Sequence, residues 1–220
     1  MVRVKICGIT NWSDAQAACE AGANLLGFNF YDKSLRRVST ADAAQIGGKL
    51  PKGVESVGVF VNASPAEIVS LRSFVRFSAA QLHGDESAAI VAEVARNMPV
   101  IKAFRVGAGF AGSTLDGYPD VFAFLLDGAH GSQYGGSGYT TDWEFARNVA
   151  GKHPIILAGG LSPENVAAAI LCVRPYAVDV ASGVESRPGK KDYAKVRDFI
   201  QEVRRAEREL EAHAEKSEKV

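Results

Sequence analysis

The chain has 220 residues, with 25 lysine and arginine residues against 25 aspartate and glutamate residues, and 47% of its residues are hydrophobic. This length suits one large domain or two small ones, and the balanced charge gives no general attraction to nucleic acid or to anionic membrane surfaces. No apolar run reaches the roughly 18 residues that span a bilayer, and no signal peptide precedes the first run. The three cysteines, Cys7, Cys19 and Cys172, lack the spacing of a metal site or of a disulfide framework. We therefore expect a cytoplasmic, single-domain protein with no metal and with no nucleic-acid or membrane partner.

Eight short apolar runs alternate with amphipathic or alanine-rich segments along the chain. The runs predict β-strands at Val2–Cys7, Leu25–Phe30, Val57–Val61, Phe77–Leu82, Val100–Phe104, Val121–Asp127, Ile155–Ala158 and Ala177–Val180. The segments between them predict helices at Ser13–Ala21, Thr40–Leu50, Pro65–Ser73, Glu86–Asn97, Asp142–Ala150 and Pro163–Leu171, with a last helix after Asp192. Thr40, Ser64 and Ser162 are typical capping residues for three of these helices. The fifth connection, near Gly107–Tyr118, is too rich in glycine to predict a helix.

This alternation predicts the architecture. Eight strand–helix units in 220 residues favour a parallel sheet with right-handed crossovers. They can close into a (β/α)8 TIM barrel, whose usual size begins at about 200 residues, or form an open doubly wound sheet. No break in composition separates two domains, so we predict a single (β/α)8 barrel domain over residues 1–220. The charged helical tail from about residue 201 is typical of a solvated helix with a frayed end, and we assign it no function.

The first predicted strand carries a cysteine at its carboxyl end, where parallel α/β folds place their chemistry. Alternation directs Val4 and Ile6 toward the helices, and Lys5 and Cys7 toward the barrel axis. Because a nearby positive charge favours a thiolate, Lys5 predicts a lowered pKa for the Cys7 thiol, below the ordinary value of about 8.5. The alternative is that Cys7 is a small buried hydrophobic residue.

Carboxylates end the sixth and eighth predicted strands. Asp127 shares a face with Leu125, at the rim of a strongly apolar strand. Desolvation at such a rim favours the protonated form of a carboxyl group, which suits a general acid. The alternative is an aspartate that caps the following loop. Asp179 has a similar position at the end of the eighth strand.

Glycine-rich segments follow the last three strands. Glycine allows backbone N–H groups to converge on an anion, and the loops after strands seven and eight form the phosphate site of many (β/α)8 enzymes. Tight turns also need glycine, so one such loop alone is weak evidence. Together they predict a site for the phosphate group of a small phosphorylated molecule, formed by Gly135, Gly136, Ser137, Gly138, Gly159, Gly160, Ser182 and Gly183.

Two further segments carry polar groups that suit a binding site. Arg36 follows the second strand, and its guanidinium matches the geometry of a carboxylate. His83 closes the fourth strand just before a helix, where a role in the turn or the helix cap is the alternative.

Taken in chain order, these segments resemble the phosphoribosylanthranilate isomerase family of tryptophan biosynthesis. The similarity runs from Lys5-Ile6-Cys7-Gly8-Ile9-Thr10 to Pro188-Gly189-Lys190-Lys191-Asp192. Between these ends lie the matching segments Gly27–Tyr31, Ser34–Ser39, Val57–Asn62, Gln81–Glu86, Leu125–Asp127, Gly135–Trp143, Leu157–Leu161 and Val178–Glu185. Each motif alone is weak, but the ordered set at the spacing of a (β/α)8 barrel is highly specific.

The resemblance implies an Amadori rearrangement of a phosphosugar, N-(5-phosphoribosyl)anthranilate, to 1-(2-carboxyphenylamino)-1-deoxyribulose 5-phosphate. In it, Cys7 is the general base and Asp127 the general acid. Arg36 lies near the anthranilate carboxylate, and His83 and Asp179 lie in the pocket. No metal or organic cofactor is needed, because the iminium form of the substrate accepts the electrons. The oligomeric state, monomer or homodimer, stays open.

The sequence departs from the family pattern at two positions. Leu35 replaces the usual proline of the loop that carries Arg36, which predicts a more mobile loop in the free protein. Ser137 replaces the usual threonine of the first glycine loop, where the backbone donors are retained. A histidine-pathway sugar isomerase is one alternative, but it would use an aspartate where Cys7 stands. A non-catalytic phosphate-binding barrel is another, and would lack the acid or the base.

Overall fold

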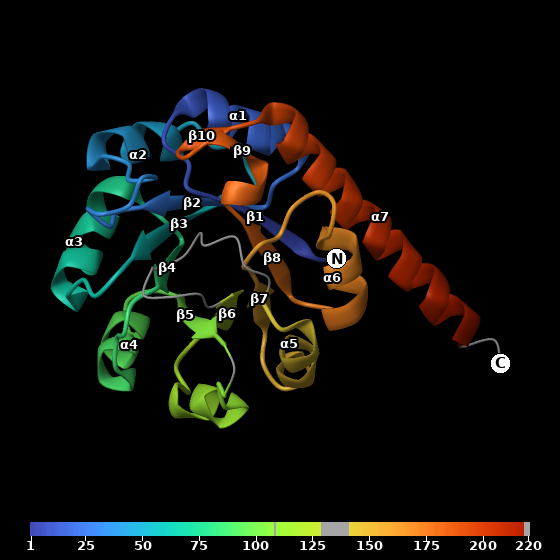
Figure 1. Cartoon of the computed structure of the whole chain (residues 1–220). Coiled ribbons are helices and arrows are strands. Elements are labelled where there is room, and N and C mark those ends of the chain that lie inside the picture. Colours follow the sequence, from blue (N-terminus) through green and yellow to red (C-terminus); the bar gives the residue numbers. More distant parts are fainter. Residues whose placement is uncertain (108, 129–140, 218–220) are drawn as a thin grey trace.

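The eight predicted strands form a closed parallel barrel (Figure 1). The structure is a computed structural model that describes residues 1–107, 109–128 and 141–217, with side chains through residue 213. Each strand pairs with the next, and the last pairs with the first. The strands are β1 Arg3–Cys7, β2 Leu25–Asn29, β3 Glu55–Phe60, β4 Ala79–Leu82, β5 Val100–Val106, β6 Ala123–Gly128, β7 Ile155–Leu157 and β8 Ala177–Val180. The prediction of a (β/α)8 barrel is confirmed, and the open doubly wound sheet is wrong.

Helices connect the strands on the outside of the barrel. They are α1 Trp12–Ala21, α2 Thr40–Gly47, α3 Pro65–Val75, α4 Ala88–Ala95, α5 Trp143–Ala150, α6 Val166–Val173 and α7 Tyr193–Ser217. The glycine-rich fifth connection carries a short 3-10 helix, η1 Gly112–Gly117, instead of an α-helix. Ser64 caps α3 in a reciprocal capping box with Glu67, as its sequence predicts. Ser39, rather than Thr40, caps α2, and α6 begins at Val166, beyond Ser162.

The alternation of side chains along each strand divides the core into two layers. Inward-facing apolar residues fill the barrel interior, and outward-facing ones pack under the helices. On β6, Ala123 and Leu125 face inward, whereas Phe124 and Leu126 face the helices. Full burial of one such leucine or phenylalanine stabilises the fold by about 1.5–3 kcal/mol. This packing holds the carboxyl ends of the strands, and the side chains they carry, in fixed positions.

The charged tail forms the second half of α7. Helix α7 packs against α1 and α6 with a buried apolar stripe that includes Phe199 and Val203. Two charged residues of the predicted tail also bind the start of β1: the amide of Val2 donates to the Glu207 carboxylate, and Arg204 donates to the Val2 carbonyl at 3.0 Å. The prediction of a wholly solvated tail is therefore wrong as far as Glu207. Leu210 also packs against the core, and the end of the helix projects away from the barrel (Figure 1).

A short hairpin, which the sequence reading missed, follows β8. After the 3-10 helix η2 Ser182–Val184, strands β9 Glu185–Arg187 and β10 Lys190–Lys191 pair antiparallel. Gly189 turns the chain between them with a φ of 77°, a conformation that favours glycine. The hairpin lies over β1 and the amino end of α1, so it brings residues near position 190 to the same end of the barrel as Cys7 (Figure 1).

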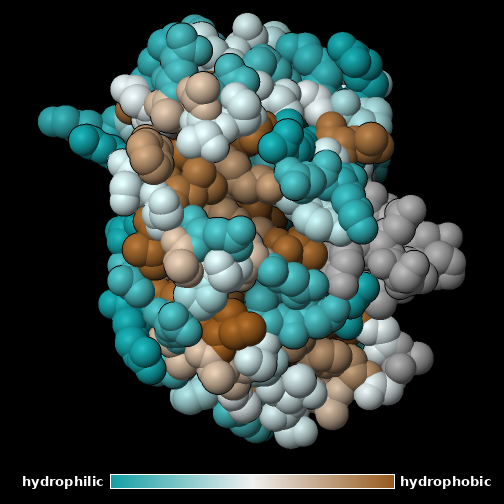
Figure 2. Space-filling view, turned by 90° about the vertical axis from the view of Figure 1, so that its left-hand side faces the viewer, coloured by the Kyte–Doolittle hydropathy of each residue, from teal (hydrophilic) through white to brown (hydrophobic). Residues whose placement is uncertain are grey.

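The surface carries a few exposed apolar side chains. Figure 2 shows the side of the molecule on which α2 and α3 lie in Figure 1, with small apolar patches among hydrophilic residues. Leu35 and Phe74 are 76% and 68% exposed, which is ordinary for single residues on a protein surface. None of the helices within the described residues is both long and apolar enough to cross a membrane.

Candidate active site

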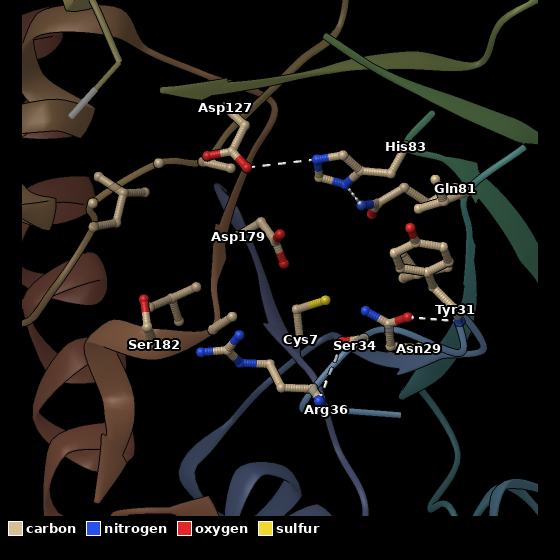
Figure 3. A pocket seen from close by; sticks show the side chains of 18 residues that line it. Cys7, Asn29, Tyr31, Ser34, Arg36, Gln81, His83, Asp127, Asp179 and Ser182 are labelled. Carbon is tan, nitrogen blue, oxygen red and sulfur yellow. Dashed lines mark hydrogen bonds and ion pairs between the residues drawn. The ribbon is translucent and has the colours of Figure 1, made fainter. Parts of the chain in front are cut away.

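One cavity opens at the carboxyl ends of the barrel strands, with an empty volume of about 730 Å³ that includes space open to solvent. It receives side chains from β1, β4, β6 and β8, and from the loops that follow β2 and β7 (Figure 3). Nearly all the described residues singled out in the sequence line it: Cys7, Arg36, His83, Asp127, Gly159, Gly160, Asp179 and Ser182. Residues that lie between positions 7 and 182 of the chain therefore meet at one site.

Cys7 ends β1 and points into this cavity (Figure 3). Its neighbour in the sheet is Gly27 of β2. A Cβ atom on Gly27 would lie 2.7 Å from the Cys7 sulfur and 3.2 Å from the Lys5 Nζ atom. The glycine is thus required for space: it allows the thiol and the ammonium group to sit side by side in the barrel.

Burial controls the protonation of Cys7. Desolvation raises the pKa of the thiol, and the carboxylate of Asp179 raises it further, while Lys5 and Lys191 lower it. Burial dominates, and the net effect is a raised pKa. The sequence-based expectation of a lowered pKa is therefore wrong, because it considered Lys5 without the burial of the thiol or the nearby aspartate. In the free protein the proton stays on sulfur up to a higher pH than in an exposed cysteine.

Lys5 and Asp179 form a buried ion pair beneath the cavity. They are direct partners in the β1–β8 register, and Lys5 Nζ donates to Asp179 Oδ1 at 2.9 Å. The Lys5 side chain is 0% exposed. Burial lowers the pKa of Lys5, but the charges of Asp179 and Cys7 more than offset this effect, so its pKa is raised. The ammonium group consequently remains a fixed positive charge beside the thiol.

Asp127 faces His83 on the opposite wall of the cavity. The distance from Asp127 Oδ2 to His83 Nε2 is 3.5 Å, longer than a strong hydrogen bond. The side-chain amide of Gln81 holds the other ring nitrogen of His83 at 2.9 Å. Among the described side chains, Gln81 Oε1 and His83 Nε2 are two of three buried polar atoms that have no hydrogen-bond partner. Both residues line the cavity, and buried polar atoms without a hydrogen-bond partner are typical of a binding site for a polar ligand.

The β7 loop packs closely behind Asp127. Gly159 and Gly160 have φ angles of 82° and 61°. A Cβ atom on Gly159 would lie 2.2 Å from the amide nitrogen of Gly128 and 2.9 Å from Asp127 Oδ1. The side-chain amide of Asn165 donates to the Gly160 carbonyl at 2.8 Å and fixes the loop. Gly159 is therefore required both by its backbone conformation and by its contact with the β6 end.

The β8 loop contributes Ser182 to the cavity, whereas Gly183 serves the packing of that loop against the β7 loop. Ser182 lines the cavity, whereas Gly183 is not among its lining residues. A Cβ atom on Gly183 would lie 1.9 Å from the Leu161 carbonyl oxygen, so this glycine allows the β8 loop to pack against the β7 loop. The third predicted glycine segment, with Gly135, Gly136, Ser137 and Gly138, lies outside the described residues.

Arg36 reaches the cavity from the β2 loop, and the structure adds a partner that the sequence did not predict. Its Nε and Nη2 atoms donate to the Glu185 carboxylate at 2.9 and 2.8 Å. Glu185 is 149 residues away in sequence. Two other cavity residues were not predicted from the sequence: Asn29, the last residue of β2, and Tyr31, which follows that strand. Gln81 had a local signal, because it lies two residues before His83 on the same strand face.

The arrangement can move protons at both ends of a small molecule. A thiol and a carboxyl group project into one cavity from opposite sides, on β1 and β6 (Figure 3). A buried ammonium group lies next to the thiol, and a guanidinium group lies at the cavity edge. Within the described part of the chain, no group of three His, Cys, Asp or Glu side chains is placed to hold a metal ion.

Comparison with known proteins gives consistent matches. A family model described as N-(5'-phosphoribosyl)anthranilate (PRA) isomerase matches residues 4–202. The N-(5'-phosphoribosyl)anthranilate isomerases of Pseudomonas fluorescens and Geobacter sulfurreducens are 50% and 48% identical to this chain. The alignments cover 92% and 93% of this chain, and 98% and 99% of those proteins.

Solved structures agree with the sequence matches. The crystal structure of phosphoribosyl anthranilate isomerase from Thermotoga maritima superposes with a TM-score of 0.87 at 43% identity, over 93% of this chain and 99% of that one. A second structure, of a phosphoribosyl anthranilate isomerase in complex with reduced 1-(o-carboxyphenylamino)-1-deoxyribulose 5-phosphate, has a TM-score of 0.84 at 42% identity, with the same coverage.

Proposed function

The chain belongs to the N-(5'-phosphoribosyl)anthranilate isomerase family and catalyses the isomerisation of that phosphosugar in tryptophan biosynthesis, and we propose that Cys7 and Asp127 carry out its acid–base chemistry. Cys7 acts as the general base and Asp127 as the general acid. The observation that carries this proposal is that both groups line one cavity, with Asp179 between them (Figure 3).

The reaction begins with a proton from Asp127. The carboxyl group protonates the furanose ring oxygen, the bond from C1 to that oxygen breaks, and the lone pair of the anthranilate nitrogen forms a C1=N iminium. The Cys7 thiolate then removes the proton from C2. The electron pair of that C–H bond forms the C1=C2 double bond, and the C=N electrons return to nitrogen. The resulting enolamine tautomerises to the aminoketose. The iminium accepts the electron pair of the broken C–H bond. The substrate therefore neither gains nor loses electrons overall.

The surroundings of Cys7 suit this sequence of steps. The base must be a thiolate, and burial alone disfavours that form. The ammonium groups of Lys5 and Lys191 oppose the burial effect, since both lower the pKa of the thiol. The positive charges next to the thiol make the thiolate more accessible than burial alone would allow. Electrostatic stabilisation of this kind is a large term in enzyme catalysis.

Binding is assigned to the remaining cavity residues. We infer that Arg36 receives the anthranilate carboxylate, and that His83 and Asp179 contact the substrate between its two ends. The β7 and β8 loops take the phosphate through Gly159, Gly160 and Ser182, while Gly183, which does not line the cavity, keeps the β8 loop packed against the β7 loop. Residues 135–138, also predicted to bind the phosphate, lie outside the described residues. Two observations support this assignment: Gly159 and Gly160 line the cavity, and both have positive φ angles, as glycines of anion-binding loops often do.

We further propose a cytoplasmic enzyme that is a monomer or a homodimer. One similar solved structure is described as that of generated monomers of the dimeric phosphoribosylanthranilate isomerase from Thermotoga maritima, so for that protein both states are described. Sedimentation of the purified chain distinguishes a monomer from a homodimer.

A cysteine substitution tests the role of Cys7. Substrate loss is followed by anthranilate fluorescence with freshly generated phosphoribosylanthranilate. Cys7→Ala should reduce turnover by about 10²–10⁴-fold, the range for loss of a general base, and should leave the affinity for the reduced product analogue within a few-fold. Cys172→Ala, in helix α6, is the matched control and should retain normal turnover. Near-normal turnover of Cys7→Ala would remove Cys7 from the mechanism.

A further inference from the structure

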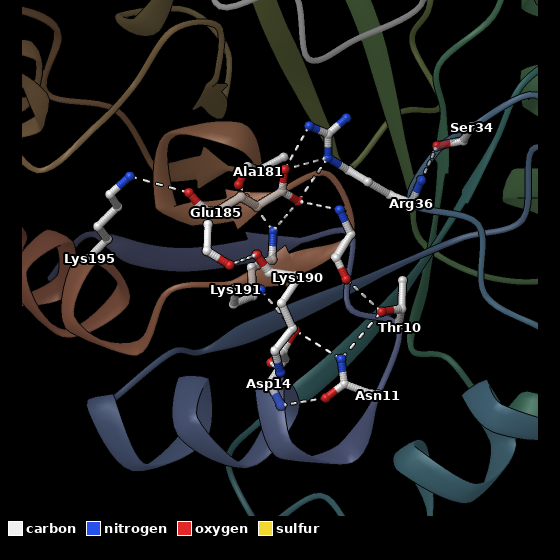
Figure 4. A network of polar contacts seen from close by, with 12 residues as sticks. Thr10, Asn11, Asp14, Ser34, Arg36, Ala181, Glu185, Lys190, Lys191 and Lys195 are labelled. Carbon is white, nitrogen blue, oxygen red and sulfur yellow. Dashed lines mark hydrogen bonds and ion pairs between the residues drawn. The ribbon is translucent and has the colours of Figure 1, made fainter.

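Glu185 is buried at the start of β9, and its carboxylate accepts hydrogen bonds from several donors. Its side chain is 4% exposed. It accepts from Arg36 Nε at 2.9 Å, from Arg36 Nη2 at 2.8 Å, from Lys191 Nζ at 3.0 Å and from the Gly189 amide at 3.3 Å (Figure 4). The hairpin that follows β8 thus binds the β2 loop through one carboxylate. Buried carboxylates require such partners, and bidentate pairing with arginine also fixes orientation.

The geometry of the guanidinium group decides which of its donors remain for a ligand. An arginine side chain has five N–H donors in one plane. Glu185 takes the edge formed by Nε and Nη2. The opposite edge, formed by Nη1 and the second N–H of Nη2, can still bind another carboxylate. Within the described residues, no hydrogen bond engages Nη1 of Arg36. The group lies on the side of the cavity where Ser182 lies (Figure 3).

The stem of Arg36 is also held by its neighbours. Gly8 has a φ of 77°, and a Cβ atom there would lie 2.7 Å from the Arg36 Cδ atom. The arginine therefore lies against the chain that directly follows Cys7. Its own amide donates to the Ser34 hydroxyl at 3.1 Å. With Gly8 on one side and Glu185 on the other, the guanidinium plane has a defined direction.

The local charges favour an incoming anion. Arg36 and Glu185 alone form a neutral pair, but the Lys191 side chain, which is 0% exposed, adds one positive charge at 3.0 Å from the Glu185 carboxylate. The outer pair of Asp14 and Lys190, at 2.6 Å, is itself balanced. The cluster of these five residues therefore has one excess positive charge for one carboxylate of the substrate.

We propose that Glu185 is a positioning residue for substrate recognition: it aligns the guanidinium of Arg36 so that its free edge receives the anthranilate carboxylate, and Lys191 keeps the cluster positive. This inference rests on the proposed role of Arg36. Glu185 itself does not touch the substrate. We expect its effect to be specific to the carboxylated ring, because the Glu185 carboxylate contacts Arg36 and none of the residues assigned to the phosphate.

Two ligands separate this role from a merely structural one. The first is reduced 1-(o-carboxyphenylamino)-1-deoxyribulose 5-phosphate, and the second is the same compound without the ring carboxylate. Glu185→Gln should weaken binding of the first by about 10-fold, the scale of one charge-assisted hydrogen bond, and that of the second by less than about 2-fold. Glu55→Gln is the matched control: Glu55 pairs with Arg3 at 2.6 Å, and neither residue lines the cavity, so it should change neither affinity.

Further variants make each outcome decisive. Glu185→Asp keeps the negative charge but moves the carboxylate away from Arg36 by the length of one methylene. Its preference for the carboxylated ligand should lie between that of the unsubstituted chain and that of Glu185→Gln. This variant carries the test if Glu185→Gln does not fold. Equal weakening of both ligands, or an unchanged preference in the Glu185 variants, would overturn the inference. Arg36→Met should abolish the preference. If it does so while the Glu185 variants keep it, only the inference about Glu185 fails; if Arg36→Met keeps the preference, the proposed role of Arg36 fails.

Discussion

The two ends of the barrel interior differ in chemistry although the same strands form both. Toward the amino ends of the strands, the interior is filled with apolar side chains such as Leu25, Ile101 and Leu125. Toward the carboxyl ends, it contains ionisable groups, and Asp127 lies only two residues beyond Leu125 on the same face of β6. One strand therefore contributes to stability at one position and to chemistry at the next inward-facing one.

This contrast shows how the fold accommodates buried charged side chains, which are unfavourable when they have no partner. Buried charges destabilise a protein unless they have partners. Lys5 and Asp179 satisfy each other at 2.9 Å. The apolar layer beneath them supplies the stability that such groups do not. Substitutions at the two ends should consequently separate loss of turnover from loss of stability.

The largest effect on turnover is expected at the carboxyl end, from Asp127→Asn. The amide keeps the size of the side chain but has no acidic proton for the ring oxygen, so turnover should fall by about 10²–10⁴-fold. Fluorescence-monitored turnover measures the loss, and titration with the reduced product analogue should give an affinity within a few-fold of normal. Asp116→Asn is the matched control, because Asp116 also faces a histidine, His153, at 3.5 Å but does not line the cavity. Loss of all affinity in Asp127→Asn would make Asp127 a structural residue.

A substitution at the apolar end should show the opposite pattern. Leu125→Ala removes a fully buried side chain from the barrel interior and should lower the free energy of unfolding by about 2–5 kcal/mol. Denaturant unfolding measures this change. Turnover per folded molecule should fall much less than in Asp127→Asn. A variant with normal stability but no turnover would contradict the division between the two ends.

The sequence predicted the barrel well because its signals are local. Each strand is a short, largely apolar run, and alternation alone directed Lys5 and Cys7 toward the barrel axis and placed Asp127 on the same face as Leu125. Elements with weak local signals were missed. Strand β10 has two residues, and η1 lies in a segment rich in glycine. The docking of Arg204 and Glu207 on Val2 depends on contacts between the two ends of the chain, which no local pattern contains.

The sequence predicted several of the residues that line the cavity, but not the electrostatics of the site. The ends of the strands identified Cys7, Asp127 and Asp179, which line one cavity. The direction of the Cys7 pKa was wrong because it depends on burial and on Asp179, 172 positions further along the chain. The pairing of Arg36 with Glu185 was also not predicted, because it joins residues that are distant in the sequence. The Glu185 carboxylate reaches the β2 loop only because the hairpin folds against it.

The pH dependence of kcat/KM, the second-order rate constant for free protein and free substrate, tests the account most directly, because it reports the ionisation of groups in the free protein. Cys7 must lose its proton to act as base, and its pKa is raised. The rate constant should therefore rise with pH along a limb that lies above the ordinary cysteine value of about 8.5, and this limb should be absent in Cys7→Ala. A limb below that value, or one that persists in Cys7→Ala, would contradict the assignment of a buried, protonated Cys7 as the general base.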